Sequence, residues 1–188
     1  MKIAITGHSS GIGQALAKQY EQRGHEIVGL SRRNGYNIRS LPKISNQIES
    51  CDMFINNAQV GYAQTELLYD IWQKWKGIKG KHIINISTLL TTVSSGPGGE
   101  YIDKNIGITQ YYVQKQALEK SHWLLVQKEV WPQMVLVKPG EVLTGDHSGP
   151  RACDADLWAE KVVDTLERID PTLKVYELSL GVDYTYGS

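Results

Sequence analysis

A glycine-rich turn stands between an apolar run and an amphipathic segment at the start of this sequence. The apolar residues 2–5 lead directly into TGHSSGIG at residues 6–13. Ile12, Leu16 and Tyr20 then recur at the spacing of one helix face. A strand, a glycine turn and a helix in immediate succession predict the first unit of a parallel α/β sheet.

Glycine suits such a turn because it adopts backbone angles that other residues avoid and lets phosphates approach the main chain. The free N–H groups and the positive dipole end of the following helix point at the same place. The pattern therefore predicts a turn that binds the pyrophosphate of a dinucleotide, and a tight turn without a ligand is the alternative. The predicted contacts are Gly7, Ser9, Ser10, Gly11, Ile12 and Gly13.

Strand-like and helix-like runs alternate along the rest of the chain. Strands are expected over Lys2–Thr6, Glu26–Leu30, Tyr36–Ile38, Met53–Asn56, Lys81–Ser87, Met134–Lys138 and Leu173–Leu178, and helices over Gly13–Arg23, Leu41–Glu49, Thr65–Lys76, Gly107–Val130 and Ala155–Ile169. This alternation builds a parallel sheet with helices on both faces. We expect a single-domain Rossmann-type, doubly wound α/β fold of about six or seven strands in the order 3-2-1-4-5-6-7. Residues 1–90 would form its cofactor half and residues 91–188 its catalytic half.

The composition argues against several other classes of protein. Twenty Lys and Arg residues balance twenty Asp and Glu residues, so the charge gives no reason to expect nucleic acid or an anionic membrane as a partner. No apolar run approaches the roughly 20 residues that cross a bilayer. Met1 leads directly into a strand, so we expect no signal peptide and a cytoplasmic protein. Cys51 and Cys153 have neither a metal-ligand spacing nor a disulfide framework, and we expect no metal site.

The end of the second predicted strand indicates which dinucleotide is bound. An NAD site usually presents an acidic residue there, whereas an arginine accommodates the 2′-phosphate of NADP. Residues 29–33 read GLSRR, without an acid. Arg32 is the first candidate for the phosphate, because a guanidinium forms charge-assisted, often paired bonds to it. Ser31 adjoins the same contact, and Arg33 either assists or is solvated, so the sequence favours NADP(H) over NAD(H).

Tyr111 and Lys115 stand four residues apart in a predicted helix, so both side chains lie on one face. A phenol can donate a proton to a carbonyl that accepts a hydride, but an unperturbed pKa near 10 is high for the reverse reaction. An ammonium about 5 Å away would favour the phenolate by roughly 3 kcal/mol, or about two pKa units. We expect Lys115 to lower the pKa of Tyr111 in this way. Tyr112 has Gln116 rather than a cation four residues on, and is expected to be a packing or rim residue.

Four motifs in order resemble those of the short-chain dehydrogenase/reductase family over nearly the whole chain. TGxxxGxG is matched at residues 6–13, NNAG is approached by NNAQ at residues 56–59, YxxxK is matched by Tyr111 and Lys115, and PGxxxT is matched by PGEVLT at residues 139–144. The family also has a serine after the fifth strand, in a stretch resembling NISS. Residues 85–88 here read NIST, so Thr88 takes that position and Ser87 is the reserve candidate.

The resemblance implies an NADP-dependent oxidoreductase that reduces a small carbonyl compound or oxidises the corresponding alcohol. It implies that Tyr111 is the general acid/base, that Lys115 also binds the nicotinamide ribose, and that Thr88 holds the substrate oxygen. A homodimer or homotetramer is expected by the same analogy. Further cofactor contacts are expected at Asn37, Ile38, Asn57, Ala58, Pro139, Gly140, Val142 and Thr144; for Asn37 and Ile38 a turn and a core residue are the alternative.

The chain departs from the family pattern at three places, and the first two, together with its short length, support a second interpretation. Gln59 replaces the last glycine of NNAG, the helix over Thr65–Lys76 lacks the family's asparagine, and the stretch between Thr88 and Tyr111 is long, with SSGPGG at residues 94–99. The second interpretation is a cofactor-binding regulatory or interaction protein that has the fold but little or no catalytic activity. Substrate specificity is expected to come from the loops over residues 59–64, 89–105 and 144–156.

Overall fold

Six parallel strands form one sheet within the part of the chain that the computed structural model describes, which is residues 1–93, 106–144, 152–170 and 172–181. The strands are β1 (Lys2–Thr6), β2 (Glu26–Leu30), β3 (Met53–Asn56), β4 (His82–Ile86), β5 (Gln133–Pro139) and β6 (Glu177–Leu180). Their order is β2-β1-β3-β4-β5-β6, and every pair is parallel. The predicted Rossmann-type α/β fold is therefore confirmed.

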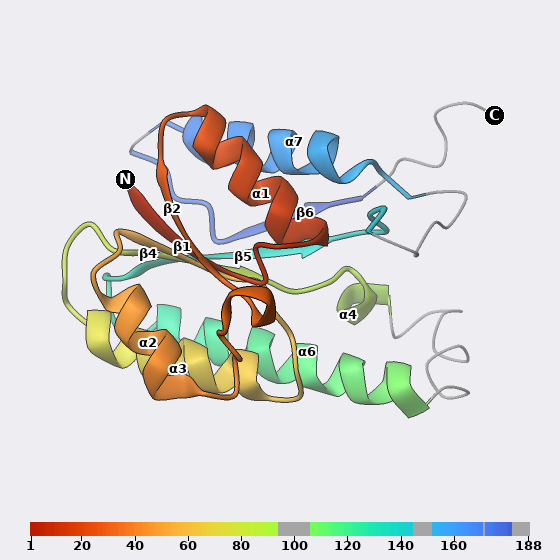
Figure 1. Ribbon diagram of the computed structural model, residues 1–188, viewed down its shortest axis with the longest axis horizontal. Coiled ribbons are helices and arrows are strands. Elements are labelled where there is room, and N and C mark those ends of the chain that lie inside the picture. Colours follow the sequence, from red (N-terminus) through yellow and green to blue (C-terminus); the bar gives the residue numbers. More distant parts are fainter. Residues whose placement is uncertain (94–105, 145–151, 171, 182–188) are drawn as a thin grey trace.

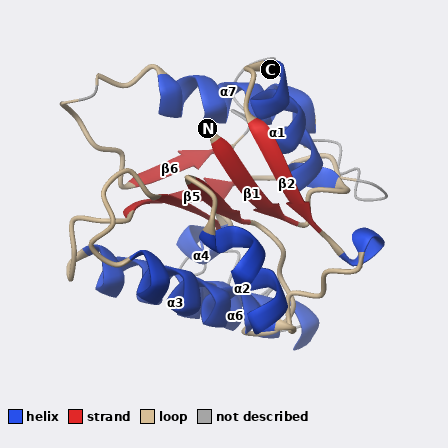
Figure 2. Ribbon diagram, turned by 60° about the vertical axis from the view of Figure 1, so that its left-hand side comes forward, coloured by secondary structure: helices blue, strands red, loops and turns tan. Residues whose placement is uncertain are grey.

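Helices cover both faces of the sheet (Figures 1 and 2). The helices α1 (Gly11–Gln22) and α7 (Ala155–Glu167) pack together on one face. The opposite face carries α2 (Leu41–Glu49), α3 (Ala63–Trp75) and α6 (Ile106–Val126), and the short α4 (Leu90–Val93) follows β4. The two faces of the strands have separate cores, because side chains along a strand alternate in direction. Ile3 and Ile5 pack with Trp158 under α1 and α7, whereas Ala4 and Phe54 pack with Trp75 under α2, α3 and α6.

The prediction of a short strand over Tyr36–Ile38 is wrong. These residues do not pair with β2, so β2 is the edge strand of the sheet. Immediately after β2 the chain turns into a 3-10 helix, η1 (Arg32–Asn34), which ends at Gly35 with φ +84°. The Oδ1 atom of Asn34 accepts from the N–H of Ser31 at 2.8 Å, and its Nδ2 atom donates to the carbonyl of Gly29 at 2.7 Å. This local turn takes residues 36–38 away from the edge of β2, so they cannot pair with it.

Two predicted ranges are also displaced in the second half of the chain. Helix α6 ends at Val126 rather than Val130, because residues 127–132 connect it to β5 and Pro132 disfavours helix at the residue before it. Strand β6 begins at Glu177 rather than Leu173, because the N–H of Leu173 donates to the carbonyl of Asp170 in a turn. The insert at residues 94–99 lies outside the described residues, as do residues 145–151 of the loop expected over 144–156.

Candidate functional site

The glycine turn of residues 7–13 lies at the carboxyl end of β1, where α1 begins. Gly7 has φ +73°, which favours glycine, and its N–H donates to the carbonyl of Leu30 at 2.8 Å. A Cβ atom on Gly13 would lie 2.4 Å from the carbonyl oxygen of Gly7. The first turn of α1 is therefore packed directly against the turn before it, and only glycine fits at this point.

The NNAQ stretch after β3 is hydrogen-bonded to Thr6, the residue that leads into the same turn. The hydroxyl of Thr6 accepts from the N–H groups of Asn57 and Ala58, each at 3.0 Å. The Nδ2 atom of Asn57 donates to the carbonyl of Thr6 at 2.9 Å. The Asn57 side chain thus joins β1 to β3, and the Ala58 residue faces the pocket described next.

A pocket of about 250 Å³ lies between the glycine turn, the end of β2 and the stretch after β3. Nine residues predicted from the sequence to bind the cofactor line it, namely Gly7, Ser9, Ser10, Ser31, Arg32, Arg33, Asn37, Ile38 and Ala58. The Nη1 atom of Arg33 donates to the carbonyl of Ser9 at 3.1 Å, so this side chain spans from η1, which follows β2, to the glycine turn. Sequence reasoning missed Tyr36, Ile44 and Val60, which line the same pocket and carry no motif of their own.

The PGEVLT stretch lies on the other side of the glycine turn. The N–H of Gly140 donates to the carbonyl of Leu180 at 2.9 Å, and Val142 forms a bridge with Cys153. A Cβ atom on Gly11 would lie 3.2 Å from the Thr144 side chain, so Thr144 lies against the turn. Pro139 ends β5 beside this stretch, and Ile12 packs into the core below α1. A second hollow, of about 760 Å³, is shared by Gly11 and Thr144.

The three residues predicted to be catalytic converge at the carboxyl end of β4. Thr88 follows β4, and Tyr111 and Lys115 lie on α6. The hydroxyl of Tyr111 is hydrogen-bonded to the side chain of Thr88. The Nζ atom of Lys115 lies 5.6 Å from the centroid of the Tyr111 ring. Ser87, the reserve candidate, is buried and its hydroxyl donates to Glu119 at 2.5 Å, which favours Thr88 as the residue that faces Tyr111.

Lys115 is directed into the protein rather than toward the Tyr111 hydroxyl. Its side chain is 3% exposed, and Nζ donates to Oε1 of Gln64 at 2.9 Å and to the carbonyl of Ile86 at 2.8 Å. Burial lowers the pKa of Lys115 to about 7, and the Glu119 carboxylate acts in the opposite direction.

Burial also raises the pKa of Tyr111, although its hydrogen bond to Thr88 acts to lower it. The expectation that Lys115 lowers the pKa of Tyr111 is therefore wrong for this arrangement. The physical reason is that desolvation of the phenol outweighs the other contributions, while the ammonium group makes its hydrogen bonds elsewhere.

Sequence reasoning missed two polar residues that surround Lys115. Gln64, at the start of α3, is buried, and its Nε2 atom donates to the carbonyls of Asn56 at 2.7 Å and Ile86 at 3.0 Å. Glu119 lies one helical turn beyond Lys115 and is also buried. The i, i+4 spacing of Glu119 was a signal that could have been used. Gln64 gave no such signal, because its contact with Lys115 joins residues 51 positions apart.

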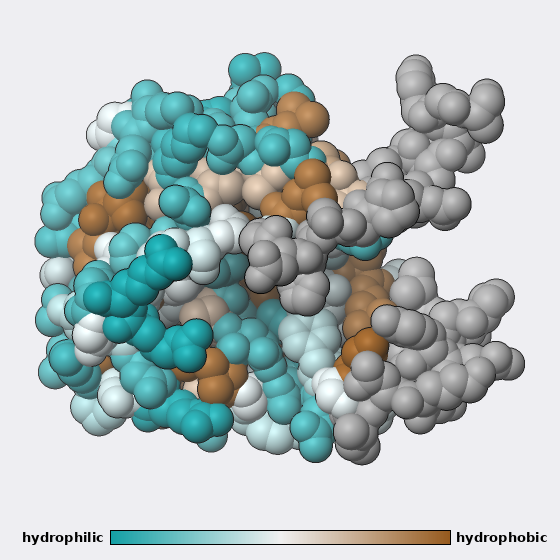
Figure 3. Space-filling view, turned by 45° about the vertical axis from the view of Figure 1, so that its right-hand side comes forward, coloured by the Kyte–Doolittle hydropathy of each residue, from teal (hydrophilic) through white to brown (hydrophobic). Residues whose placement is uncertain are grey.

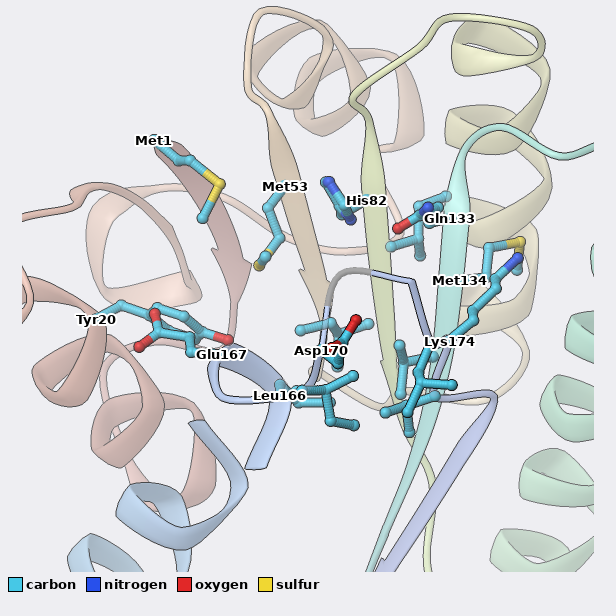
Figure 4. A pocket seen from close by; sticks show the side chains of 16 residues that line it. Met1, Tyr20, Met53, His82, Gln133, Met134, Leu166, Glu167, Asp170 and Lys174 are labelled. Atoms are coloured by element: carbon cyan, nitrogen blue, oxygen red, sulfur yellow. The ribbon is translucent and has the colours of Figure 1, made fainter. Parts of the chain in front are cut away.

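Another pocket, of about 350 Å³, lies at the opposite edge of the sheet, among the amino ends of β3, β4 and β5 (Figure 4). Met53, His82 and Gln133 line it where those strands begin. None of the predicted site residues is among its lining residues. Ligands of open parallel sheets bind at the carboxyl ends of the strands, which is the edge opposite this pocket. Figure 3 turns that carboxyl edge toward the viewer, and its surface there is hydrophilic with small hydrophobic patches.

Comparisons with known proteins agree with this fold. Residues 3–71 match the sequence profile of the NAD dependent epimerase/dehydratase family. An alcohol dehydrogenase from the archaeon Thermococcus sibiricus, complexed with 5-hydroxy-NADP, superposes with a TM-score of 0.73 at 14% identity, over 97% of each chain. A 3-alpha-hydroxysteroid dehydrogenase from Pseudomonas sp. B-0831, complexed with NADH, has a TM-score of 0.62 at 18% identity, over 96% of this chain and 95% of that chain.

A short-chain dehydrogenase from Sphingobium yanoikuyae in complex with NADPH has a TM-score of 0.67 at 16% identity, over 95% of this chain and 87% of that chain. No curated protein sequence matches the chain. The predicted resemblance to the short-chain dehydrogenases/reductases is thus confirmed at the level of the fold. Along the described residues, no helix has both the length and the apolar character needed to cross a membrane, and no group of three His, Cys, Asp or Glu side chains is arranged to hold a metal ion.

Proposed function

We propose that this chain is an oxidoreductase of the short-chain dehydrogenase/reductase family that uses NADP(H) to reduce a small carbonyl compound, or to oxidise the corresponding alcohol. The observation that carries the proposal is the convergence of Thr88, Tyr111 and Lys115 at the same sheet edge as the glycine turn. The family-profile match over residues 3–71 supports the nucleotide-binding half of the proposal. The solved structures with this fold include dehydrogenases bound to NADPH and to NADH.

The residues of the 250 Å³ pocket fit the adenosine half of NADP(H). Arg32 and Arg33 supply the positive charge that a 2′-phosphate requires, and none of the described residues that line this pocket is acidic. Arg33 also donates to the carbonyl of Ser9, which joins η1 to the glycine turn. The start of α1 beside Gly7 supplies free N–H groups and a positive dipole end for the pyrophosphate.

When bound, NADPH supplies a hydride to the carbonyl carbon of the substrate. Tyr111 donates its phenolic proton to the carbonyl oxygen, and the Thr88 hydroxyl donates a hydrogen bond to the same atom. The raised pKa of Tyr111 supports this role, because it keeps the phenol protonated at neutral pH. The family resemblance implies that Lys115 binds the nicotinamide ribose, but its buried Nζ atom donates to Gln64 and to the carbonyl of Ile86 here, so the proposed step assigns it no direct contact with the cofactor.

A fluorescence titration with NADPH and with NADH, followed by a screen of aldehydes and ketones, tests the proposal. We expect tighter binding of NADPH and turnover of at least one carbonyl compound. Tyr111→Phe removes the proton donor and should reduce kcat by about 100-fold or more, with little change in the affinity for NADPH. Tyr112→Phe is the matched control, because this tyrosine is bonded to Gln116 instead. Full activity of Tyr111→Phe would exclude Tyr111 as the acid.

One observation favours a second candidate function, a cofactor-binding protein without turnover. Gln59, in place of the family's glycine, donates from Nε2 to Oε1 of Gln114 on α6. This contact joins the stretch after β3 to the helix of Tyr111 and narrows the space between them. Tight NADPH binding without turnover of any carbonyl in the screen, together with activity gained by Gln59→Gly, would support this second function.

A further inference from the structure

Glu119 makes a buried cluster with the residues on either side of Thr88. It lies on α6, one turn beyond Lys115, and is 8% exposed. Its Oε1 atom accepts from the hydroxyl of Ser87 at 2.5 Å and from the hydroxyl of Thr91 at 2.6 Å. Its Oε2 atom lies 2.9 Å from Nζ of the buried Lys138, on β5.

Of the two hydroxyl partners of Glu119, Ser87 begins the turn between β4 and α4 and Thr91 lies in the first turn of α4, with Thr88 between them. The Thr91 hydroxyl is also 2.8 Å from the carbonyl oxygen of Thr88, and the N–H of Leu90 donates to the Thr88 hydroxyl oxygen at 3.2 Å. The Oε1 atom of Glu119 is thereby connected to the side chains of Ser87 and Thr91 and, through Thr91, to the main chain of Thr88. The Tyr111 hydroxyl, on the same helix as Glu119, is hydrogen-bonded to the Thr88 side chain.

A carboxylate is a costly choice for packing alone. Removing a charge from water costs several kcal/mol even when it is paired, and an apolar side chain of similar size is often at least as stabilising. Glu119 needs Lys138 as its counter-ion, and Lys138 lies between Glu119 and Glu177, whose Oε1 atom is 3.6 Å from Nζ. The cluster therefore holds the turn in one position at an energetic cost that an apolar contact would not carry.

We propose that Glu119 is a positioning residue for the proposed reaction, holding the Ser87–Thr91 turn against α6 so that the Thr88 hydroxyl meets the Tyr111 hydroxyl. The proposal rests on the proposed function for its catalytic meaning, but the contact itself is testable without turnover. Among the described residues, the Thr88 side chain from the turn and Lys115 from α6 face Tyr111, and Glu119 faces Lys115 from the same helix. The Glu119 carboxylate also favours the charged form of Lys115.

Fluorine NMR of protein labelled with 3-fluorotyrosine tests the positioning. The Tyr111 resonance is assigned with Tyr111→Phe and followed through a pH titration. Thr88→Val removes the hydroxyl directly and should raise the pKa of Tyr111 by up to about one unit. We expect Glu119→Gln to shift the Tyr111 resonance and, like Thr88→Val, to raise the pKa of Tyr111. Asp164→Asn is the matched control, because it breaks an ion pair with Arg23 (2.6 Å) between α1 and α7, away from this site.

A Tyr111 resonance and pKa unchanged in a folded Glu119→Gln protein would overturn the proposal. If the unpaired Lys138 prevents folding of that variant, the double variant Glu119→Gln/Lys138→Gln has no unpaired buried charge and decides instead. With a carbonyl substrate from the screen, Glu119→Gln should lower kcat by about tenfold or more while the Kd for NADPH is unchanged. Absence of turnover in the wild-type protein would reject the proposed function, whereas the fluorine measurement would still decide the positioning.

Discussion

Single side chains at this site have more than one partner, and the choice among partners determines what each can do. Lys115 donates to Gln64 and to the main chain of β4, so its charge is held in a buried position close to the Tyr111 ring. Arg33 donates to the glycine turn, whereas Arg32 lines the same pocket at the N-terminus of η1. The structure thus gives Arg33 a partner in the glycine turn, where the sequence left open whether this side chain assists or is solvated.

Arg32 is expected to contribute directly to the affinity for NADPH. A charge-assisted bond to phosphate contributes about 1.5–3 kcal/mol, so Arg32→Ala should raise the Kd for NADPH by about tenfold to a hundredfold. The affinity for NADH should change much less, because that dinucleotide lacks the 2′-phosphate. Arg39→Ala is the control, since Arg39 is exposed and outside the pocket. An equal loss of affinity for NADPH and NADH would show that Arg32 does not bind the 2′-phosphate.

The lowered pKa of Lys115 predicts a pH dependence of stability. The unfolded chain holds the Lys115 proton up to about pH 10.5 and the folded chain only up to about pH 7, so this group makes the protein more stable as pH rises between those values. Below about pH 7 both states are protonated and the whole cost of burying the charge is present. Lys115→Met should therefore gain stability relative to the wild type at pH 6, and this gain should shrink toward pH 10.

Urea denaturation at pH 6, 8 and 10 measures this effect through the midpoint concentration. Lys120→Met, on an exposed position of the same helix, should show no such change with pH. A difference between Lys115→Met and wild type that stays constant with pH would contradict the prediction. The ammonium group would then be equally charged in the folded and unfolded states over this range.

At the scale of elements, the site depends on how closely a helix or turn approaches its neighbour. Helix α1 packs on the glycine turn at Gly13, and the β4–α4 turn is held to α6 by Glu119. Through these two contacts, the glycine turn and the β4–α4 turn are held in fixed positions at the carboxyl edge of the sheet. This arrangement allows loop residues such as Thr88 to keep a defined geometry.

Gly13→Ala tests the approach of α1 to the turn. The added Cβ would lie 2.4 Å from the carbonyl of Gly7, so either the helix or the turn must shift. Overpacking of this kind costs about 1–3 kcal/mol, and we expect a lower urea midpoint together with weaker NADPH binding. Gln22→Ala, at the exposed end of α1, should leave both unchanged. A Gly13→Ala protein with wild-type stability and affinity would contradict the close packing.

At the scale of the whole molecule, the helices α3 and α6 form an outer surface on one side of the sheet (Figure 2). Tyr69 and Leu124 are exposed on these helices by 44% each. We propose that this surface joins two or four copies of the chain, as the family resemblance implies. Leu124→Glu should then shift the mass measured by light scattering toward the monomer. Leu157→Glu, on the exposed side of α7, should not change it, and a monomeric wild-type protein would reject the proposal.

Most of the fold could be predicted because its signals are local. Alternating apolar runs and helical spacing identified β1, β2, β3 and α2 with the observed bounds. The strand expected over Tyr36–Ile38 failed because the hydrogen bonds of Asn34 redirect the chain before it can pair. Pairing with an edge strand depends on position in space, which the apolar pattern of three residues does not specify.

The sequence by itself determined the parallel α/β sheet and the glycine turn, because both depend on residue type and spacing along the chain, and its family resemblance made Thr88, Tyr111 and Lys115 the candidate catalytic residues. Only the tertiary structure decided that Lys115 bonds to Gln64, that Ser87 belongs to Glu119, and that burial raises the pKa of Tyr111. These properties arise from desolvation and from contacts between residues that are distant in sequence. Such terms exist only once the strands and helices are packed together.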